Sequence, residues 1–163
     1  MGRNILAIDP GNVLSGWCIL DDETLKPLNF DKSYNPDVIY LIEREDTALP
    51  IDEIVIERVA SYGMVVGAEV FHTCEWIGRF VQKAADMGIK YSYIYRNAEK
   101  LHICHDTKAK DANIRRALID RFAEHDLKNG KGTKDNPDFF YGFRADVWTA
   151  YAVGLTYIEA GKD

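Results

Sequence analysis

The chain has 163 residues, a mass of 18.5 kDa and a formal net charge of −6. This length predicts a single domain, residues 1–163, with a core of its own. Its hydrophobic fraction of 47% and charged fraction of 28% are ordinary for a globular protein and exclude a largely disordered chain. The first apolar run is too short for a signal peptide or a membrane span, so we expect a cytoplasmic location and no membrane partner.

The charge is unevenly distributed along the chain. Residues 1–95 contain 8 Lys and Arg against 15 Asp and Glu, whereas residues 96–144 contain 11 against 8. Because phosphates attract basic surfaces, the second segment is the candidate for contact with nucleic acid despite the acidic total. The alternative is that these Lys and Arg side chains only solvate helix faces.

Three strands are predicted first. Residues 4–9 form a short apolar run closed by Pro10-Gly11-Asn12, and residues 15–20 form a second run, so the two are expected to pair as a hairpin. Residues 25–30 predict a third strand, which Pro27 places at a sheet edge. A short helix over 37–44 and a buried strand over 51–57 follow.

A long helix is predicted over residues 65–87 from an apolar stripe at intervals of three or four. The stripe consists of Val66, Val70, Cys74, Ile77 and Val81. Phe71, Trp76 and Phe80 lie beyond this stripe and are candidates for a dimer interface or for internal packing.

The last part of the chain predicts a strand over 91–95, a helix over 111–122 capped by Asp111, and a terminal helix over 144–160. Residues 127–142 are rich in Gly, Asn and Pro, which indicates a functional or mobile loop. Together these elements predict an α/β fold with a five-stranded mixed sheet, three antiparallel strands followed by parallel ones, and helices on both faces.

Three carboxylates occupy positions where a charge is locally expensive. Asp9 follows Ile5-Leu-Ala-Ile8, Glu57 follows Ile54-Val-Ile56, and Asp146 begins an apolar helix. Buried charges are tolerated when they are paired or bind a metal, so a shared divalent cation is one explanation. Taken singly, Asp146 could instead favour the helix dipole and Glu57 could be a surface residue at a strand end.

These segments resemble the ordered motifs of RuvC-like Holliday junction resolvases, including phage-type members. The motifs are Ile8-Asp-Pro-Gly-Asn-Val-Leu-Ser-Gly-Trp17, Ile54-Val-Ile-Glu57 and Arg144-Ala-Asp-Val-Trp-Thr-Ala-Tyr-Ala152. The resemblance spans nearly the whole chain. It implies an RNase H-like fold, a homodimer, and hydrolysis of two DNA strands placed symmetrically at a four-way junction.

The resemblance also implies roles for the three carboxylates. Asp9 would bridge two Mg²⁺ or Mn²⁺ ions, Glu57 and Asp146 would each help to hold one, and water would be the nucleophile. Hard oxygen ligands suit these ions, and two ions can stabilise both the attacking and the leaving oxygen of a phosphodiester.

The sequence departs from the family pattern at two positions. Phe143 stands where the family usually has a fourth carboxylate, for which Asp111 or Asp138 could substitute. Ala60 stands where many members have an aromatic residue that stacks on DNA, and Tyr62 is the nearest replacement.

Basic residues near the helix predicted to begin at 111 are the candidates for contact with DNA. Lys108 and Lys110 resemble the family's phosphate-binding stretch and precede a helix N-terminus, which attracts phosphate. Further candidates are Arg115, Lys131, Lys134 and Arg144.

Three other functions stay open on the sequence. The chain could be a related nuclease acting on RNA or other branched DNA, because catalytic carboxylates do not encode substrate shape. It could be a catalytically impaired junction-binding module, since the fourth carboxylate is missing. An actin-like ATPase fragment has a similar Asp-x-Gly hairpin but needs a second domain to enclose its nucleotide.

Overall fold

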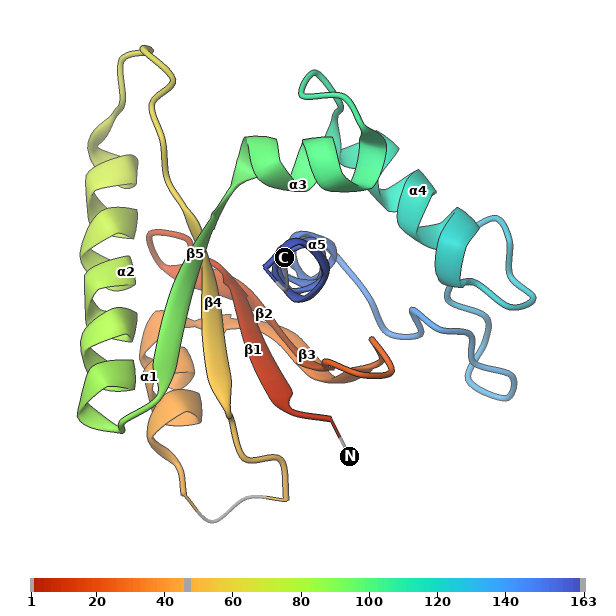
Figure 1. Cartoon of the computed structure of the whole chain (residues 1–163), viewed down its shortest axis with the longest axis horizontal. Helices are drawn as coiled ribbons and strands as arrows, with labels where there is room; N and C mark the ends of the chain where they lie inside the picture. Colours follow the sequence, from red (N-terminus) through yellow and green to blue (C-terminus); the bar gives the residue numbers. More distant parts are fainter. Residues whose placement is uncertain (1, 46–47, 162–163) are drawn as a thin grey trace.

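The computed structural model describes residues 2–45 and 48–161, whose centre is one five-stranded sheet of order β3-β2-β1-β4-β5 (Figure 1). The strands are β1 (Asn4–Asp9), β2 (Leu14–Asp21), β3 (Pro27–Tyr34), β4 (Glu53–Arg58) and β5 (Lys90–Tyr95). The first three are antiparallel neighbours, and β4 and β5 run parallel to β1. The predicted mixed sheet is confirmed, and the third strand is longer than the sequence suggested.

Helices cover both faces of the sheet, as predicted. One face packs against α1 (Asn35–Glu43) and α2 (Ala68–Asp86), and the other against α5 (Asp146–Ala160) (Figure 1). Beyond α5 lie α3 (Arg96–Cys104) and α4 (Asp111–Phe122), which pack against it. Within the described part of the chain, no helix has the length and apolar character needed to cross a membrane.

The alternation of side chains along each strand assigns residues to the two faces. On β1, Ile5 and Ala7 join the core beneath α5, whereas Leu6 and Ile8 join the core beneath α1 and α2. Asp9 continues the first series, so its side chain belongs to the α5 face. On β4 the same face receives Val55 and therefore also its alternate neighbours Glu53 and Glu57.

Helix α5 lies close to the sheet because two glycines leave room for it. A Cβ on Gly154 of α5 would come within 2.6 Å of Leu20 and 3.0 Å of Ala7. A Cβ on Gly16 of β2 would come within 2.6–2.8 Å of Asp146, the first residue of α5. Atoms in folded proteins do not pack this closely, so a side chain at either position would push the helix away. Both glycines therefore allow α5, and Asp146 with it, to lie against the sheet.

Three predictions about the helices are corrected by the structure. Helix α2 is rotated from the predicted stripe: Phe80 is fully buried and Cys74 is exposed, because Thr73, Ile77, Phe80 and Ala84 form its buried face. Helix α3 was not predicted at all. Asp111 does not cap α4, since Lys110 occupies the N-cap position and its N–H donates to Asn113 Oδ1 at 2.9 Å.

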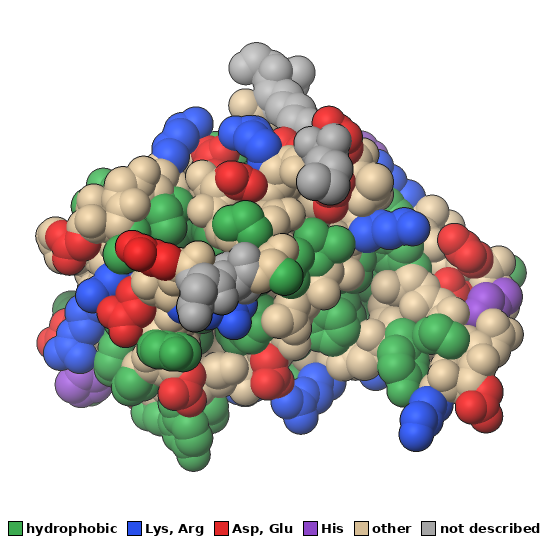
Figure 2. All heavy atoms as spheres, turned by 90° about the horizontal axis from the view of Figure 1, so that it is seen from below, with side chains coloured by type: hydrophobic (Ala, Val, Ile, Leu, Met, Phe, Trp, Pro, Cys, Tyr) green, Lys and Arg blue, Asp and Glu red, His purple; other side chains and the backbone are tan. Residues whose placement is uncertain are grey.

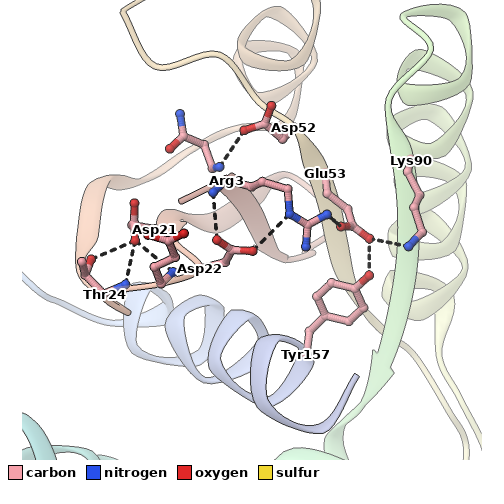
Figure 3. Close-up of polar contacts among 10 residues, drawn as sticks. Arg3, Asp21, Asp22, Thr24, Asp52, Glu53, Lys90 and Tyr157 are labelled. Carbon is pink, nitrogen blue, oxygen red and sulfur yellow. Dashed lines mark hydrogen bonds and ion pairs between the residues drawn. The ribbon is translucent and has the colours of Figure 1, made fainter. Parts of the chain in front are cut away.

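A buried ionic cluster holds the N-terminal ends of β1 and β4 (Figure 3). Glu53 is 1% exposed and accepts hydrogen bonds from Tyr157 and from Arg3 Nη1 at 3.1 Å, with Lys90 Nζ at 3.0 Å. Burial alone would raise the pKa of Glu53, but the bonds from Tyr157 and Lys90 lower it overall. This carboxylate is therefore fully partnered inside the protein.

Figure 2 shows the molecule from this end, toward which β1, β4 and β5 point their N-termini. Acidic and basic side chains are interspersed on this side, with no broad area of one sign. Such a surface offers phosphate groups no concentrated attraction.

Glu159 of α5 joins the two outer helices to α5. Its carboxylate accepts two hydrogen bonds from Arg121 of α4, at 2.7 and 2.6 Å, and lies 3.0 Å from Nε2 of His102 of α3. The hydrogen bonds from Arg121 lower the pKa of Glu159 from 4.5 to about 2. The contact fixes α3 and α4 relative to the helix that carries Asp146.

We expect Glu159→Gln to lower the free energy of unfolding at pH 7 by about 1 kcal/mol. The ion pair of Glu159 with Arg121 has two short hydrogen bonds, but it is partly exposed to solvent. The folded-state pKa lies below the unfolded one, so the contribution is present above about pH 4.5 and is lost as the pH falls toward 2. Urea unfolding of wild type and variant at several pH values measures this difference, with Glu124→Gln as the control. A difference that does not shrink on acidification would contradict the assignment.

Candidate active site

Asp9 stands at the end of β1, in a row of residues that crosses the sheet. It is opposite Gly16 of β2, and Gly16 is opposite Lys32 of β3. On its other side, Ile8 is the register partner of Ile56, which places Glu57 of β4 beside Asp9. Because β1 and β4 are parallel, their C-terminal ends bring the two carboxylates to one end of the sheet.

Asp146 reaches the same place from α5. The space above Gly16 receives the first turn of the helix, so Asp146 lies between the sheet position of Asp9 and Lys32. Lys32 Nζ is 2.8 Å from Asp146 Oδ2. Ala145, just before the helix, has φ of +41°, a conformation that side chains other than glycine adopt at a cost. Backbone strain thus accompanies the placement of Asp146.

Arg96, the first residue of α3, is the cation on the other side of the site. Its Nη1 lies 3.6 Å from Glu57 Oε2 and 3.7 Å from Glu99 Oε1, and its Nη2 forms an ion pair with Asp111. The guanidinium therefore serves three carboxylates from β4, α3 and α4 at once. Asp111 and Asp146 both line a hollow with Arg96, Arg115 and Trp148, which is the entrance to this region.

The electrostatics of Asp9 follow from this crowding. Burial raises the pKa of Asp9 well above its usual value, and the carboxylates of Glu57 and Asp146 raise it further. Arg96 and Lys32 act in the opposite direction but do not cancel the effect. A further cation near Asp9 would relieve the repulsion among the three carboxylates.

Glu99 is a residue of the site that the sequence interpretation missed. Burial and the adjacent Glu57 carboxyl raise the pKa of Glu99 from 4.5 to about 11, against a smaller lowering by Arg96. The two carboxyls can hydrogen bond to each other only when one carries a proton. No signal in the sequence pointed to Glu99, because α3 has few apolar residues, its Leu101 is exposed, and its one buried residue is a glutamate.

The donors in this region are of the type that Mg²⁺ or Mn²⁺ binds. Asp9, Glu57, Glu99 and Asp146 all offer carboxylate oxygens. Glu57 Oε2 and both oxygens of Glu99 are buried without a hydrogen-bond partner in the described part of the chain. Within residues 2–45 and 48–161, however, no three Asp, Glu, His or Cys side chains converge closely enough to hold an ion as they stand. Lys32 pairs with Asp146 and Arg96 lies near Glu57, so the oxygen donors suit a hard cation in their chemistry while these two basic side chains hold the carboxylates apart from one another.

Asp111 and Asp138, the two candidates for the fourth carboxylate, lie in different surroundings. Asp138 accepts backbone hydrogen bonds from Glu124, His125, Asp126 and Phe139 at 2.6–2.9 Å, which closes the loop around residues 123–139 and leaves it no metal-binding role. Asp111 lies at the entrance but its side chain is 74% exposed and paired with Arg96. Phe143 itself is buried in an aromatic cluster with Phe30, Phe140, Trp148 and Tyr151.

The predicted DNA-contacting residues lie around the site at different distances from it. Lys108 and Lys110 are exposed in the connection between α3 and α4, and Tyr62 is 53% exposed in the loop between β4 and α2. Figure 1 shows these two loops at the same end of the molecule, above the C-terminal ends of β4 and β5.

Arg115 lies at the entrance to the site, since it lines the hollow with Asp146, and its guanidinium carbon is 5.2 Å from the ring centroid of Trp148. It also lines an adjoining hollow with Lys128 and Lys131. Lys134 is exposed in the loop before α5, and Arg144 pairs with Asp31 at 2.6 Å.

The sheet order, the helices on both faces and the acidic end of β1 and β4 define an α/β protein of RNase H-like fold. Among solved structures, the chain has the fold of RuvC. It matches T. thermophilus RuvC in complex with a Holliday junction substrate at a TM-score of 0.69 and 13% identity, over 98% of this chain and 95% of that chain. A second Thermus thermophilus RuvC structure matches at 0.66 and 15% identity, over 98% and 97%. A scan against protein-family models and a search of curated proteins gave no match.

We expect Asp9→Asn to stabilise the protein in EDTA by about 1–3 kcal/mol, several degrees in Tm, because it removes a partly buried charge beside two other carboxylates. Thermal unfolding followed by circular dichroism measures the shift, with Asp135→Asn on the exposed loop as the control. A lower Tm for Asp9→Asn without metal would contradict the repulsion described above.

Proposed function

We propose that this chain is a metal-dependent endonuclease that resolves four-way DNA junctions by hydrolysing phosphodiesters. The observation that carries the proposal is the meeting of Asp9, Glu57 and Asp146 at one end of the sheet, on a fold that matches RuvC over nearly its full length. A two-fold homodimer would match the symmetry of a junction and let each subunit nick one strand.

Asp9 would be the central cation ligand, because it lies between Glu57 on the neighbouring strand and Asp146 on α5. Glu57 and Asp146 would each help to hold a cation. When bound, Mg²⁺ or Mn²⁺ would offset the charge of the phosphate and stabilise the attacking and leaving oxygens. Lys32 and Arg96 keep Asp146 and Glu57 partly neutralised until a cation takes over that role.

The surroundings of the site suit a branched, negatively charged substrate. Lys108 and Lys110 precede the twelve-residue helix α4, whose N-terminus adds its dipole to their charge. Arg115 extends the basic surface to the entrance of the site. Tyr62, exposed in the loop on the other side, offers a ring on which a base could stack.

A junction-binding module without catalysis is the second candidate function. It is favoured by Phe143, which occupies the position expected for a fourth carboxylate and is buried in the aromatic cluster. A nuclease acting on RNA or other branched DNA would use the same carboxylates. Cleavage assays on several substrates separate these possibilities from the leading proposal.

We expect wild-type protein with Mg²⁺ to cleave a synthetic four-way junction and Asp9→Asn to reduce the rate by at least about a thousandfold, since the central cation ligand is lost. Junction binding should survive or tighten, because the change also removes a negative charge. Gel assays of cleavage and of binding in EDTA measure both, with Asp135→Asn as the control.

Unchanged cleavage by Asp9→Asn would contradict the site assignment. Equal cleavage of junction, linear duplex and RNA–DNA hybrid would contradict junction selectivity. Tight junction binding by the wild type without any cleavage would favour the binding module.

We expect Lys108→Ala and Lys110→Ala each to weaken junction binding and to reduce the slope of log K against log salt by about one, because each removes one phosphate contact. Fluorescence anisotropy in EDTA at 50–200 mM salt measures the slope. Lys26→Ala, in the turn between β2 and β3 at the far end of the sheet, should leave it unchanged. Identical slopes for all three variants and the wild type would remove this segment from the interface.

A further inference from the structure

Glu99 lies one turn into α3, directly after β5. It is 0% exposed and is the one buried residue of that helix. An apolar side chain would be expected at such a position, since burying a carboxylate without partners costs several kcal/mol. An acid at this place therefore needs either a proton shared with the Glu57 carboxyl or a compensating cation.

The compensation inside the described chain is incomplete. Neither oxygen of Glu99 has a hydrogen-bond partner among the described residues, and Arg96 approaches Oε1 only to 3.7 Å. Glu53, on the face of the sheet that packs against α5, is a buried carboxylate with a structural role. Arg3, Lys90 and Tyr157 all contact it. Glu99 has no comparable set.

Glu99 faces Glu57, the predicted metal ligand of β4. The same Arg96 nitrogen lies 3.6 Å from Glu57 Oε2 and 3.7 Å from Glu99 Oε1. Glu57 Oε2 is likewise buried without a hydrogen-bond partner in the described part of the chain. Two carboxylate oxygens without hydrogen-bond partners in the described chain thus lie near one nitrogen of Arg96, at distances too long for a hydrogen bond.

We propose that Glu99 is a direct ligand of the divalent cation held by Glu57, and that it supplies from α3 the carboxylate that Phe143 does not supply from the segment before α5. The inference rests on the proposed metal-dependent function. The other acids near the site do not compete: Asp138 is consumed by backbone hydrogen bonds, and Asp111 is exposed and paired with Arg96.

The test measures Mn²⁺ binding without DNA by isothermal titration calorimetry. We expect Glu99→Gln, which keeps the shape and removes the charge, to weaken Mn²⁺ binding by at least about tenfold. Glu23→Gln, on the exposed turn at the far end of the sheet, should bind Mn²⁺ as the wild type does. A folded Glu99→Gln variant with wild-type Mn²⁺ affinity would overturn the proposal, as would a wild type that binds no Mn²⁺.

A crystal structure of the wild type with Mn²⁺ makes the test independent of how the variant folds. Anomalous scattering locates the ions, and a Glu99 oxygen in a coordination shell supports the proposal, whereas its absence from every shell overturns it. Junction cleavage assayed in parallel keeps the two proposals distinct. Mn²⁺ held by Glu99 in a protein that cleaves no junction contradicts the function alone, and cleavage with normal Mn²⁺ binding by Glu99→Gln contradicts the role of Glu99 alone.

Discussion

The close approach of α5 to the sheet at Gly16 is the constraint on which the rest of the site depends. Because β2 has no side chain there, the first turn of α5 lies against the sheet and Asp146 enters the row formed by Asp9 and Lys32. A Cβ at Gly16 would collide with Asp146 and displace it from this row. The same approach of α5 partly buries Asp9 and brings Asp146 close to it, so the close packing also causes the electrostatic repulsion in the site.

The two glutamates of β4 that face α5 differ in how their buried charge is compensated. Glu53, at the N-terminal end, is satisfied by an arginine, a lysine and a tyrosine and stabilises the fold. Glu57, four residues later, shares one arginine with Glu99 and Asp111 and keeps an unsatisfied oxygen. Two glutamates on one strand face thus differ in how fully they are partnered, because tertiary packing brings different cationic side chains to them.

The outer helices connect this chemistry to the surface. Helix α3 begins with Arg96 and carries Glu99 inward, while its connection to α4 presents Lys108 and Lys110 outward. Glu159 fixes both helices to α5 through Arg121 and His102. The basic surface proposed to hold phosphate and the acidic site proposed to hold cations are therefore parts of one rigidly connected unit.

The sequence by itself determined the order of strands and most helices, because alternating and three-to-four-residue apolar patterns reflect burial directly. It also singled out Asp9, Glu57 and Asp146, since a carboxylate at the end of an apolar run is locally visible. Three features were decided only by the tertiary structure: the rotation of α2 that buries Phe80, the existence of α3, and the burial of Glu99. Each depends on contacts between segments far apart in the chain, and a glutamate in a predominantly polar helix carries no local sign that it will be buried.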